Sequence, residues 1–236
     1  MISDFKQIEI LFEEINHNLK SKVHVYLIGG VVLLHQELKP ATKDIDLIIL
    51  KKQEFVTFEQ ALKAARFETK IPTGAYKKMN LSQIYIRNDF RIDAFHETVC
   101  RKFSLSKGMK KRAIKLFALS YLDLNLCSNE DIFVFKTFTE REGDLKDCIA
   151  LAEKGLDWNV IINELQSQIR HSGEDVWITW IGERLDLLME KGLNIPIMDK
   201  IDKLRDTYFE ELERTFPEKK TTKRKAQKAD SNHKLM

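Results

Sequence analysis

The sequence has few cysteines, no long apolar run and almost no net charge. Its three cysteines, Cys100, Cys127 and Cys148, form neither a CxxC pair nor a zinc-ligand spacing, which indicates reduced thiols in a cytosolic protein. The first residues include acidic side chains and no apolar core, so they do not resemble a signal peptide. No apolar run approaches the ~18 residues of a membrane span. We therefore expect a soluble, cytoplasmic protein without a membrane partner.

Charge is nearly balanced, with 39 Lys and Arg against 36 Asp and Glu and a formal net charge of +3. This balance alone says little about partners, whereas local basic clusters at 107–115 and 219–228 are more informative. The last twenty residues, 217–236, are rich in Lys and nearly devoid of apolar side chains, so we predict a basic disordered tail. Such a tail either contacts RNA phosphates or only keeps the chain soluble.

The most informative stretch runs from Tyr26 to Leu50. An apolar run ends at Gly29 and Gly30, and two acids, Asp44 and Asp46, follow in a β-branched strand. Because strand side chains alternate between faces, both carboxylates point to the same face, where they repel each other. A divalent cation removes that cost, since hard cations take carboxylate oxygens as ligands.

A third carboxylate, Asp93, lies between apolar neighbours in the segment FRIDAF. If its strand lies beside the first acidic strand, three carboxylates meet at one edge of the sheet. The glycine pair sits at a strand-to-helix turn, where backbone N–H groups can approach a phosphate. A tight turn and three exposed acids are the plainer explanation of each feature alone, but the combined spacing favours a phosphate and metal site.

Together these motifs resemble the nucleotidyltransferase superfamily typified by DNA polymerase beta, over about the first hundred residues. The matching segments are Ile28-Gly29-Gly30, Asp44-Ile45-Asp46-Leu47 and Ile92-Asp93-Ala94. The resemblance implies that Asp44, Asp46 and Asp93 are catalytic and ligate Mg²⁺ or Mn²⁺ in a two-metal site that stabilises the attacking and leaving oxygens. It also implies that Gly29 and Gly30 bind the nucleotide phosphates.

A second motif lies in FKTFTEREGDLKD. Lys136, Arg141, Asp144 and Asp147 resemble the K-x4-R-x2-D-x2-D pattern of abortive-infection (AbiEii-type) toxins and related bacterial and archaeal nucleotidyltransferases. The resemblance implies that Lys136 and Arg141 contact the triphosphate, and that the two acids hold the helices or assist the site. The alternative is a solvated helix face on which Lys136 pairs with Glu140.

The sequence departs from the family at one position. Relatives often carry an Arg two residues before the Thr of the T-x-D-I-D segment, and this chain has Pro40 there. Lys39 or Lys43 would supply the missing charge, although Lys does not reproduce a bidentate guanidinium. We therefore include Lys43 among the predicted phosphate contacts.

Apolar spacing predicts an α+β (α/β) fold. Predicted helices cover 4–19, 31–38 and 54–67, and predicted strands cover 23–28, 44–50, 81–87 and 90–95, with one or two more strands within 113–126. From a capping box at Ser128 and Asp131 the pattern turns helical, with further helices over 144–154, 158–169, 176–190 and 197–216. This predicts a nucleotidyltransferase core with a small mixed sheet over 1–127, a helical C-terminal domain over 128–216 and the tail.

The expected activity is magnesium-dependent transfer of a nucleoside monophosphate from ATP or another NTP to a hydroxyl, with release of pyrophosphate. The acceptor stays open between a tRNA or other RNA end, a protein side chain and a small molecule such as an aminoglycoside. Two other readings of the fold remain. One is a nucleotide-binding module that has lost catalysis, and the other is a toxin masked by a cognate antitoxin-like partner.

Overall fold

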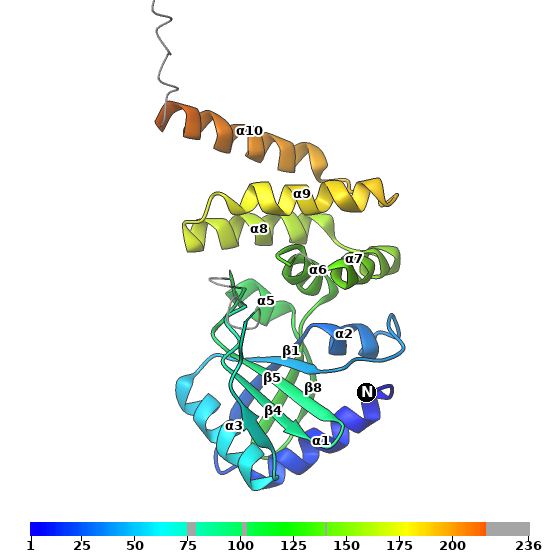
Figure 1. Ribbon diagram of the computed structural model, residues 1–236, viewed down its shortest axis with the longest axis vertical. Helices are drawn as coiled ribbons and strands as arrows, with labels where there is room; N and C mark the ends of the chain where they lie inside the picture. The colour runs from blue at the N-terminus through cyan, green and yellow to red at the C-terminus, as the bar shows by residue number, and fades with distance from the viewer. Residues whose placement is uncertain (75–78, 101–102, 140, 216–236) are drawn as a thin grey trace, which may run out of the picture.

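The computed structural model describes residues 1–74, 79–100, 103–139 and 141–215. In these residues a seven-stranded mixed sheet with helices forms the N-terminal part, and α6 to α10 are stacked above it (Figure 1). The predicted α+β class is confirmed. The predicted tail and the partner Glu140 lie outside the described residues. No described helix is long and apolar enough to cross a bilayer.

The sheet has the strand order β3-β4-β5-β2-β1-β9-β8. Its strands are β1 (Val23–Ile28), β2 (Ile45–Ile49), β3 (Glu68–Lys70), β4 (Gln83–Arg87), β5 (Phe90–His96), β8 (Ile114–Ala118) and β9 (Leu122–Leu126). The pairs β2–β5 and β1–β9 are parallel, and the other neighbours are antiparallel. A separate two-stranded ribbon joins β6 (Thr98–Val99) to β7 (Phe103–Ser104).

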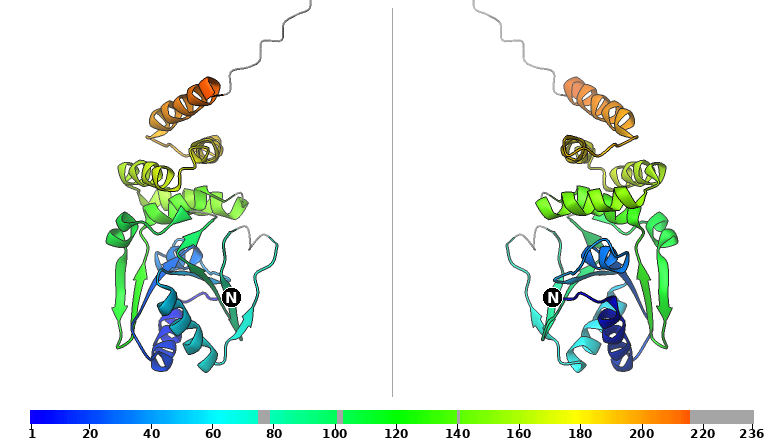
Figure 2. Two further views of the ribbon diagram at one scale, coloured as in Figure 1. Left: turned by 90° about the vertical axis from the view of Figure 1, so that its left-hand side faces the viewer. Right: turned by 90° about the vertical axis from the view of Figure 1, so that its right-hand side faces the viewer.

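Alternation along the central strands decides which face of the sheet is covered. In β1, Val23, Val25 and Leu27 are fully buried, while the residues between them are partly exposed. Helix α1 (Phe5–Asn18) lies beside α3 (Lys52–Ala64), and α3 packs against β1 and β2 (Figure 2). The intervening side chains of β1 and β2 point to the opposite face of the sheet, and Asp46 is one of them.

A short helix, α2 (Gly30–His35), follows β1 directly, and its side chains from Val31 to Leu34 are buried. Burial of these four residues anchors the end of β1. The turn between strand and helix is therefore held in place by packing on its far side.

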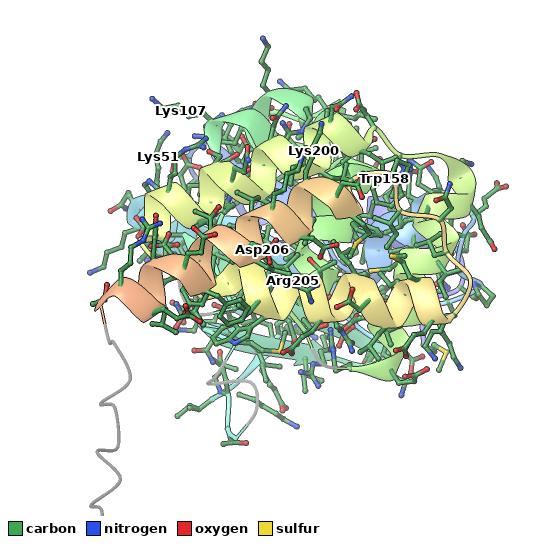
Figure 3. All side chains as sticks on the ribbon, turned by 90° about the horizontal axis from the view of Figure 1, so that it is seen from above. Lys51, Lys107, Trp158, Lys200, Arg205 and Asp206 are labelled. Carbon is green, nitrogen blue, oxygen red and sulfur yellow. The ribbon has the colours of Figure 1, made fainter. Side chains whose placement is uncertain are left out.

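The C-terminal part contains α6 (Asn129–Thr137), α7 (Glu142–Lys154), α8 (Trp158–Ser172), α9 (Trp177–Glu190) and α10 (Met198–Thr215). Helices α7, α8 and α9 pack on α6, and α10 packs on α9. The predicted cap is present, since the Ser128 hydroxyl accepts a hydrogen bond from the Asp131 N–H at 3.3 Å. Seen from above, α10 lies across α8 and α9, and its Arg205 forms ion pairs with Asp186 of α9 and Asp202 (Figure 3).

Three short elements were not predicted: β3, the β6–β7 ribbon and α5 (Lys107–Arg112). Elements of two to six residues are too short for their apolar side chains to show a period. Helix α5 forms the first part of the basic cluster at 107–115. The hydroxyl of its N-cap residue, Ser106, accepts a hydrogen bond from the Met109 N–H at 3.0 Å. The predicted boundary at residue 127 lies between β9 and α6, and its role as a domain boundary stays a prediction.

Arg112 joins α5 to the helical part. Its Nη2 atom lies 2.6 Å from Asp131 Oδ1 on α6 and 2.6 Å from Glu164 Oε2 on α8. Asp131 is fully buried and Glu164 is 5% exposed. The guanidinium therefore compensates two buried carboxylates at once.

We expect Arg112→Ala to lower the free energy of unfolding by about 3–5 kcal/mol, because removing one partner leaves buried charge uncompensated. Denaturant-induced unfolding measures the change. Arg214→Ala is the control, since its pair with Glu210 is exposed on both sides and should change stability by less than about 0.5 kcal/mol. Equal effects of the two substitutions would show that Arg112 has no special role.

Candidate active site

The glycine pair lies where β1 ends and α2 begins. Gly29 has φ +69°, and a Cβ atom there would overlap Asp46 Oδ2 and lie 3.2 Å from Asp46 Cβ. A Cβ on Gly30 would lie 2.6 Å from Thr42 Oγ1. Only glycine allows the backbone to lie this close to both side chains. The pair therefore brings the turn directly against the acidic strand.

The three predicted carboxylates lie on neighbouring strands. Asp46 is the register partner of Ile28 in β1 and of Asp93 in β5. Register partners point to the same face of a sheet, so Asp46 and Asp93 are neighbours there. Asp44 precedes β2 by one residue and shares their face by alternation. The structure thus brings Asp44, Asp46, Asp93 and Gly29 together, as the sequence predicted.

Asp44 and Asp93 lie close enough to Asp46 to affect its ionisation. Burial raises the pKa of Asp46 well above its usual value, and repulsion from Asp44 and Asp93 raises it further. The charges of Lys136 and Arg141 oppose this increase. Asp46 is therefore a carboxylate whose ionised form requires nearby positive charge.

Asp93 has a direct cationic partner, Arg91, that the sequence motifs did not predict. The Arg91 guanidinium donates from Nε to Oδ1 and from Nη2 to Oδ2, both at 2.7 Å. Burial raises the pKa of Asp93, while the hydrogen bonds and charge of Arg91 offset part of the increase. A residue two positions away on the same strand shares the face, so alternation was the signal for this contact.

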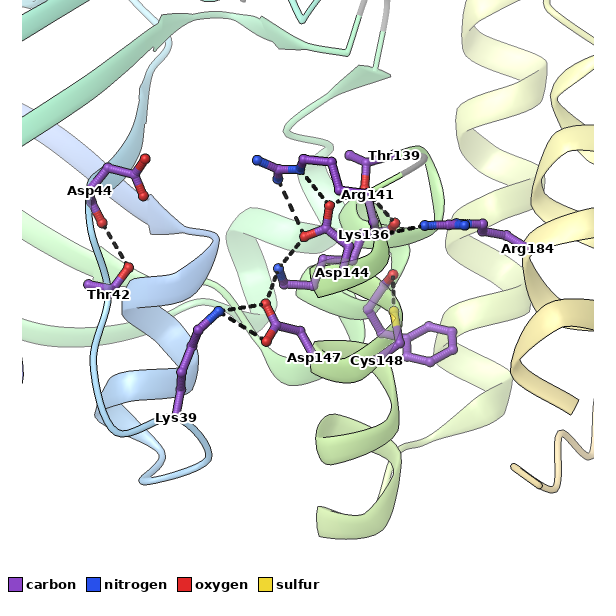
Figure 4. Close-up of polar contacts among 11 residues, drawn as sticks. Lys39, Thr42, Asp44, Lys136, Thr139, Arg141, Asp144, Asp147, Cys148 and Arg184 are labelled. Carbon is purple, nitrogen blue, oxygen red and sulfur yellow. Dashed lines mark hydrogen bonds and ion pairs between the residues drawn. The ribbon is translucent and has the colours of Figure 1, made fainter. Parts of the chain in front are cut away.

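Lys136 is surrounded by acids rather than by solvent (Figure 4). Its Nζ atom lies 2.8 Å from Asp144 Oδ1 and 2.6 Å from Asp147 Oδ2, and the residue is only 6% exposed. The alternative of a solvated helix face is therefore wrong, because α7 packs against the side of α6 that carries Lys136. Asp144 and Asp147 hold the two helices together, which was one of the roles expected for them.

Arg141 connects this cluster to the acidic strands. Its Nε donates to Asp144 Oδ2 at 2.7 Å, yet its side chain is 64% exposed. Burial alone would lower the pKa of Arg141, but Asp144, Asp46 and Asp44 raise it. In Figure 4 the guanidinium points to the side on which Asp44 lies. Arg141 is therefore a cation facing the carboxylates.

The two lysines considered as replacements for the missing Arg differ. Lys39 lies 3.1 Å from both carboxylate oxygens of Asp147 and so links the loop before β2 to α7. Lys43 is exposed, while its neighbour Thr42 donates from Oγ1 to the Asp44 carbonyl at 3.1 Å. Contact of Lys43 with phosphate stays a prediction.

The fit to a divalent cation rests on Asp44 and Asp46. Within the described ranges, no group of three or more His, Cys, Asp and Glu side chains is arranged to hold a metal ion. Mg²⁺ commonly takes only one or two protein carboxylates and completes its shell with substrate phosphates and water. Two carboxylates on one face that repel each other fit this requirement.

Gly29→Ala tests the close approach of the turn to Asp46. Gly155 is the control for backbone strain, because it also has a positive φ outside the left-handed helical region (φ +101°, ψ 127°, against φ +69°, ψ −144° for Gly29) and has open space around it. We expect Gly155→Ala to lower the free energy of unfolding by about 1–3 kcal/mol, and Gly29→Ala to cost clearly more because it also displaces Asp46. Denaturant-induced unfolding compares the two, and equal losses would contradict the steric argument.

The pKa of Asp144 supports a pH-dependent prediction. Burial alone would raise it, but Lys136, Thr139 and Arg141 hold it below the usual value. A carboxyl whose folded pKa is depressed stabilises the fold above its unfolded pKa of about 3.9, and this stabilisation is lost as pH falls through the folded pKa. Asp144→Asn should therefore cost about 1–3 kcal/mol at pH 7, with a gap that shrinks below about pH 4.

Unfolding free energies at pH 7, 4 and 3 measure this gap. Glu142→Gln, in the same helical turn but with a 64% exposed side chain, should show almost no gap at any pH. A gap for Asp144→Asn that stays constant with pH would contradict the prediction.

Comparison with known proteins identifies the family of this chain. Residues 6–175 match a family model described as "Nucleotidyltransferase of unknown function (DUF6036)". No curated protein matches the sequence.

Similar solved structures include the crystal structure of ANT(2")-Ia in complex with adenylyl-2"-tobramycin, at 9% identity and a TM-score of 0.45 over 69% of this chain and 97% of that chain. A solution structure of ANT(2'')-Ia aligns at 10% identity and a TM-score of 0.48 over 72% and 95% of the two chains. The family match covers most of the chain, so the protein belongs to this nucleotidyltransferase family, in agreement with the enzyme class predicted from the sequence.

Proposed function

We propose that the protein transfers a nucleoside monophosphate from an NTP to a hydroxyl acceptor, with release of pyrophosphate, and that it uses Mg²⁺ or Mn²⁺. The observation that supports this most is the register of β2 and β5, which makes Asp46 and Asp93 neighbours beside Asp44 and the glycine turn. A fold that needed only stability would not hold three carboxylates together on one face.

In this proposal Asp44 and Asp46 hold the cation and Asp93 is the third catalytic carboxylate. When bound, the ion supplies Lewis-acid polarisation of the phosphate and lowers the pKa of an oxygen nucleophile. Asp93 faces the acceptor hydroxyl and takes its proton, a role suited to a carboxylate whose pKa is raised.

Positive charge around the carboxylates stabilises the bound triphosphate in this proposal. Gly29 and Gly30 let the backbone approach the phosphates, as their lack of a Cβ already lets it approach Asp46 and Thr42. Arg141 and Lys43 are exposed and can reach a ligand, whereas Lys136 acts through its charge because Asp144 and Asp147 hold its ammonium. Fixed cations of this kind stabilise the charge that develops in phosphoryl transfer.

The narrower assignment follows the second motif. Lys136, Arg141, Asp144 and Asp147 lie in one polar cluster, as a joint role in an AbiEii-type toxin-like group would require. We propose on this basis an acceptor at an RNA end or a protein side chain, with small molecules as the alternative, and an antitoxin-like partner. The absence of a disulfide among the described residues fits a cytoplasmic location.

A nucleotide-binding module without catalysis is the second candidate. It is favoured by one observation, which is that Arg91 already engages both oxygens of Asp93. Calorimetry distinguishes the two functions, since a binding module takes up NTP without the heat of continued turnover.

Asp46→Asn should reduce transfer of the labelled α-phosphate by about 10²–10³-fold or more, because it removes one charge of the cation site at constant shape. Each of the four NTPs is supplied with Mg²⁺ or Mn²⁺, total RNA and cell lysate, and the labelled acceptor is identified by mass. Asp89→Asn, in the exposed turn between β4 and β5, should leave transfer unchanged. Undiminished transfer by Asp46→Asn would rule out the proposed site.

A further inference from the structure

Arg91 and Asp93 form a closed pair at the acidic site. The Arg91 guanidinium donates a hydrogen bond to each carboxylate oxygen of Asp93 at 2.7 Å. The side chains of Arg91 and Asp93 are 28% and 4% exposed. Bidentate pairs of this geometry are among the strongest charge-assisted contacts. A metal ion bound through Asp93 would have to displace at least one of these hydrogen bonds.

Asp44 and Asp46 differ from Asp93 in this respect. Within the part of the chain that the structure describes, neither of their side-chain carboxylates accepts a hydrogen bond or forms an ion pair. Lys136 and Arg141 act on Asp46 through their charges, while their own hydrogen bonds go to Asp144 and Asp147. The site therefore contains two carboxylates that are available to a cation, Asp44 and Asp46. The third, Asp93, is already paired with Arg91.

Two arrangements compensate the charge of an ionised carboxylate that is buried beside other acids. One is a second divalent ion and the other is a cation belonging to the chain. Arg remains charged at any relevant pH and matches the shape of a carboxylate, so it provides the second arrangement permanently. Mg²⁺ in turn needs only one or two protein carboxylates when substrate phosphates complete its shell.

We propose that Arg91 takes the place of a second divalent cation at Asp93, so that the chain binds one Mg²⁺ or Mn²⁺ through Asp44 and Asp46. Arg91 is then a positioning residue that keeps Asp93 fixed and outside the metal shell. This replaces the two-ion site with Asp93 as a ligand that the sequence implied. It rests on the proposed function only in taking Asp44 and Asp46 as the cation site.

The test counts bound Mn²⁺ by electron paramagnetic resonance, with a non-hydrolysable ATP analogue present. Wild-type protein should bind one Mn²⁺ per chain, and Arg91→Ala should bind two because Asp93 is released. The double variant Arg91→Ala/Asp93→Asn should return to one. Arg87→Ala, which removes an Arg of β4 paired with Glu14 instead, should stay at one.

Three results would overturn the inference: a wild-type count other than one, an unchanged count in folded Arg91→Ala, or a second ion in Arg87→Ala. Asp93→Asn covers the case in which Arg91→Ala does not fold, since Asn keeps the shape of Asp. Its Mn²⁺ affinity should fall by no more than the about 10–100-fold that loss of a group outside the metal shell causes, whereas complete loss of Mn²⁺ binding would place Asp93 inside the shell.

This count is independent of the transfer assay. One bound Mn²⁺ without transfer of label would support the role of Arg91 and contradict the proposed function. Two bound ions with transfer of label would support the proposed function and contradict the role of Arg91.

Discussion

Repulsion among three carboxylates on one face of the sheet is the constraint on which the rest of the site depends. The β2–β5 register places Asp46 beside Asp93, and burial raises the pKa of both. Charges that are buried together destabilise a fold unless cations compensate them. The surroundings of the acidic face can be understood as that compensation.

The compensation comes from different parts of the chain at different distances. Arg91, on the same strand as Asp93, acts by direct contact. Arg141, at the start of α7, faces the carboxylates from the helical part, and Lys136 contributes charge from further inside. The cations are themselves held by carboxylates, Arg91 by Asp93, Arg141 by Asp144, and Lys136 by Asp144 and Asp147.

Charged contacts also join the two parts of the molecule. Lys39 connects the loop before the acidic strand to Asp147 of α7, and Arg112 connects α5 to α6 and α8. The contact between Lys39 and Asp147 lies next to the candidate site. The contacts of Arg112 lie elsewhere between the N-terminal part and the helical part. The sheet and the helices that carry the candidate residues are thus held in a defined relation.

The sequence by itself determined the strands that carry Asp46 and Asp93, the turn at Gly29 and the cap at Ser128. These features depend on side-chain alternation and on hydrogen bonds between residues that are close in the chain. Only the tertiary structure decided that Lys136 is buried and that Lys39 reaches Asp147, 108 residues away. Burial and partners at such separations arise from the packing of whole helices, which no local period records. Arg91 stands between the two cases, because alternation placed it on the face of Asp93 but only the folded site showed that its guanidinium holds that carboxylate.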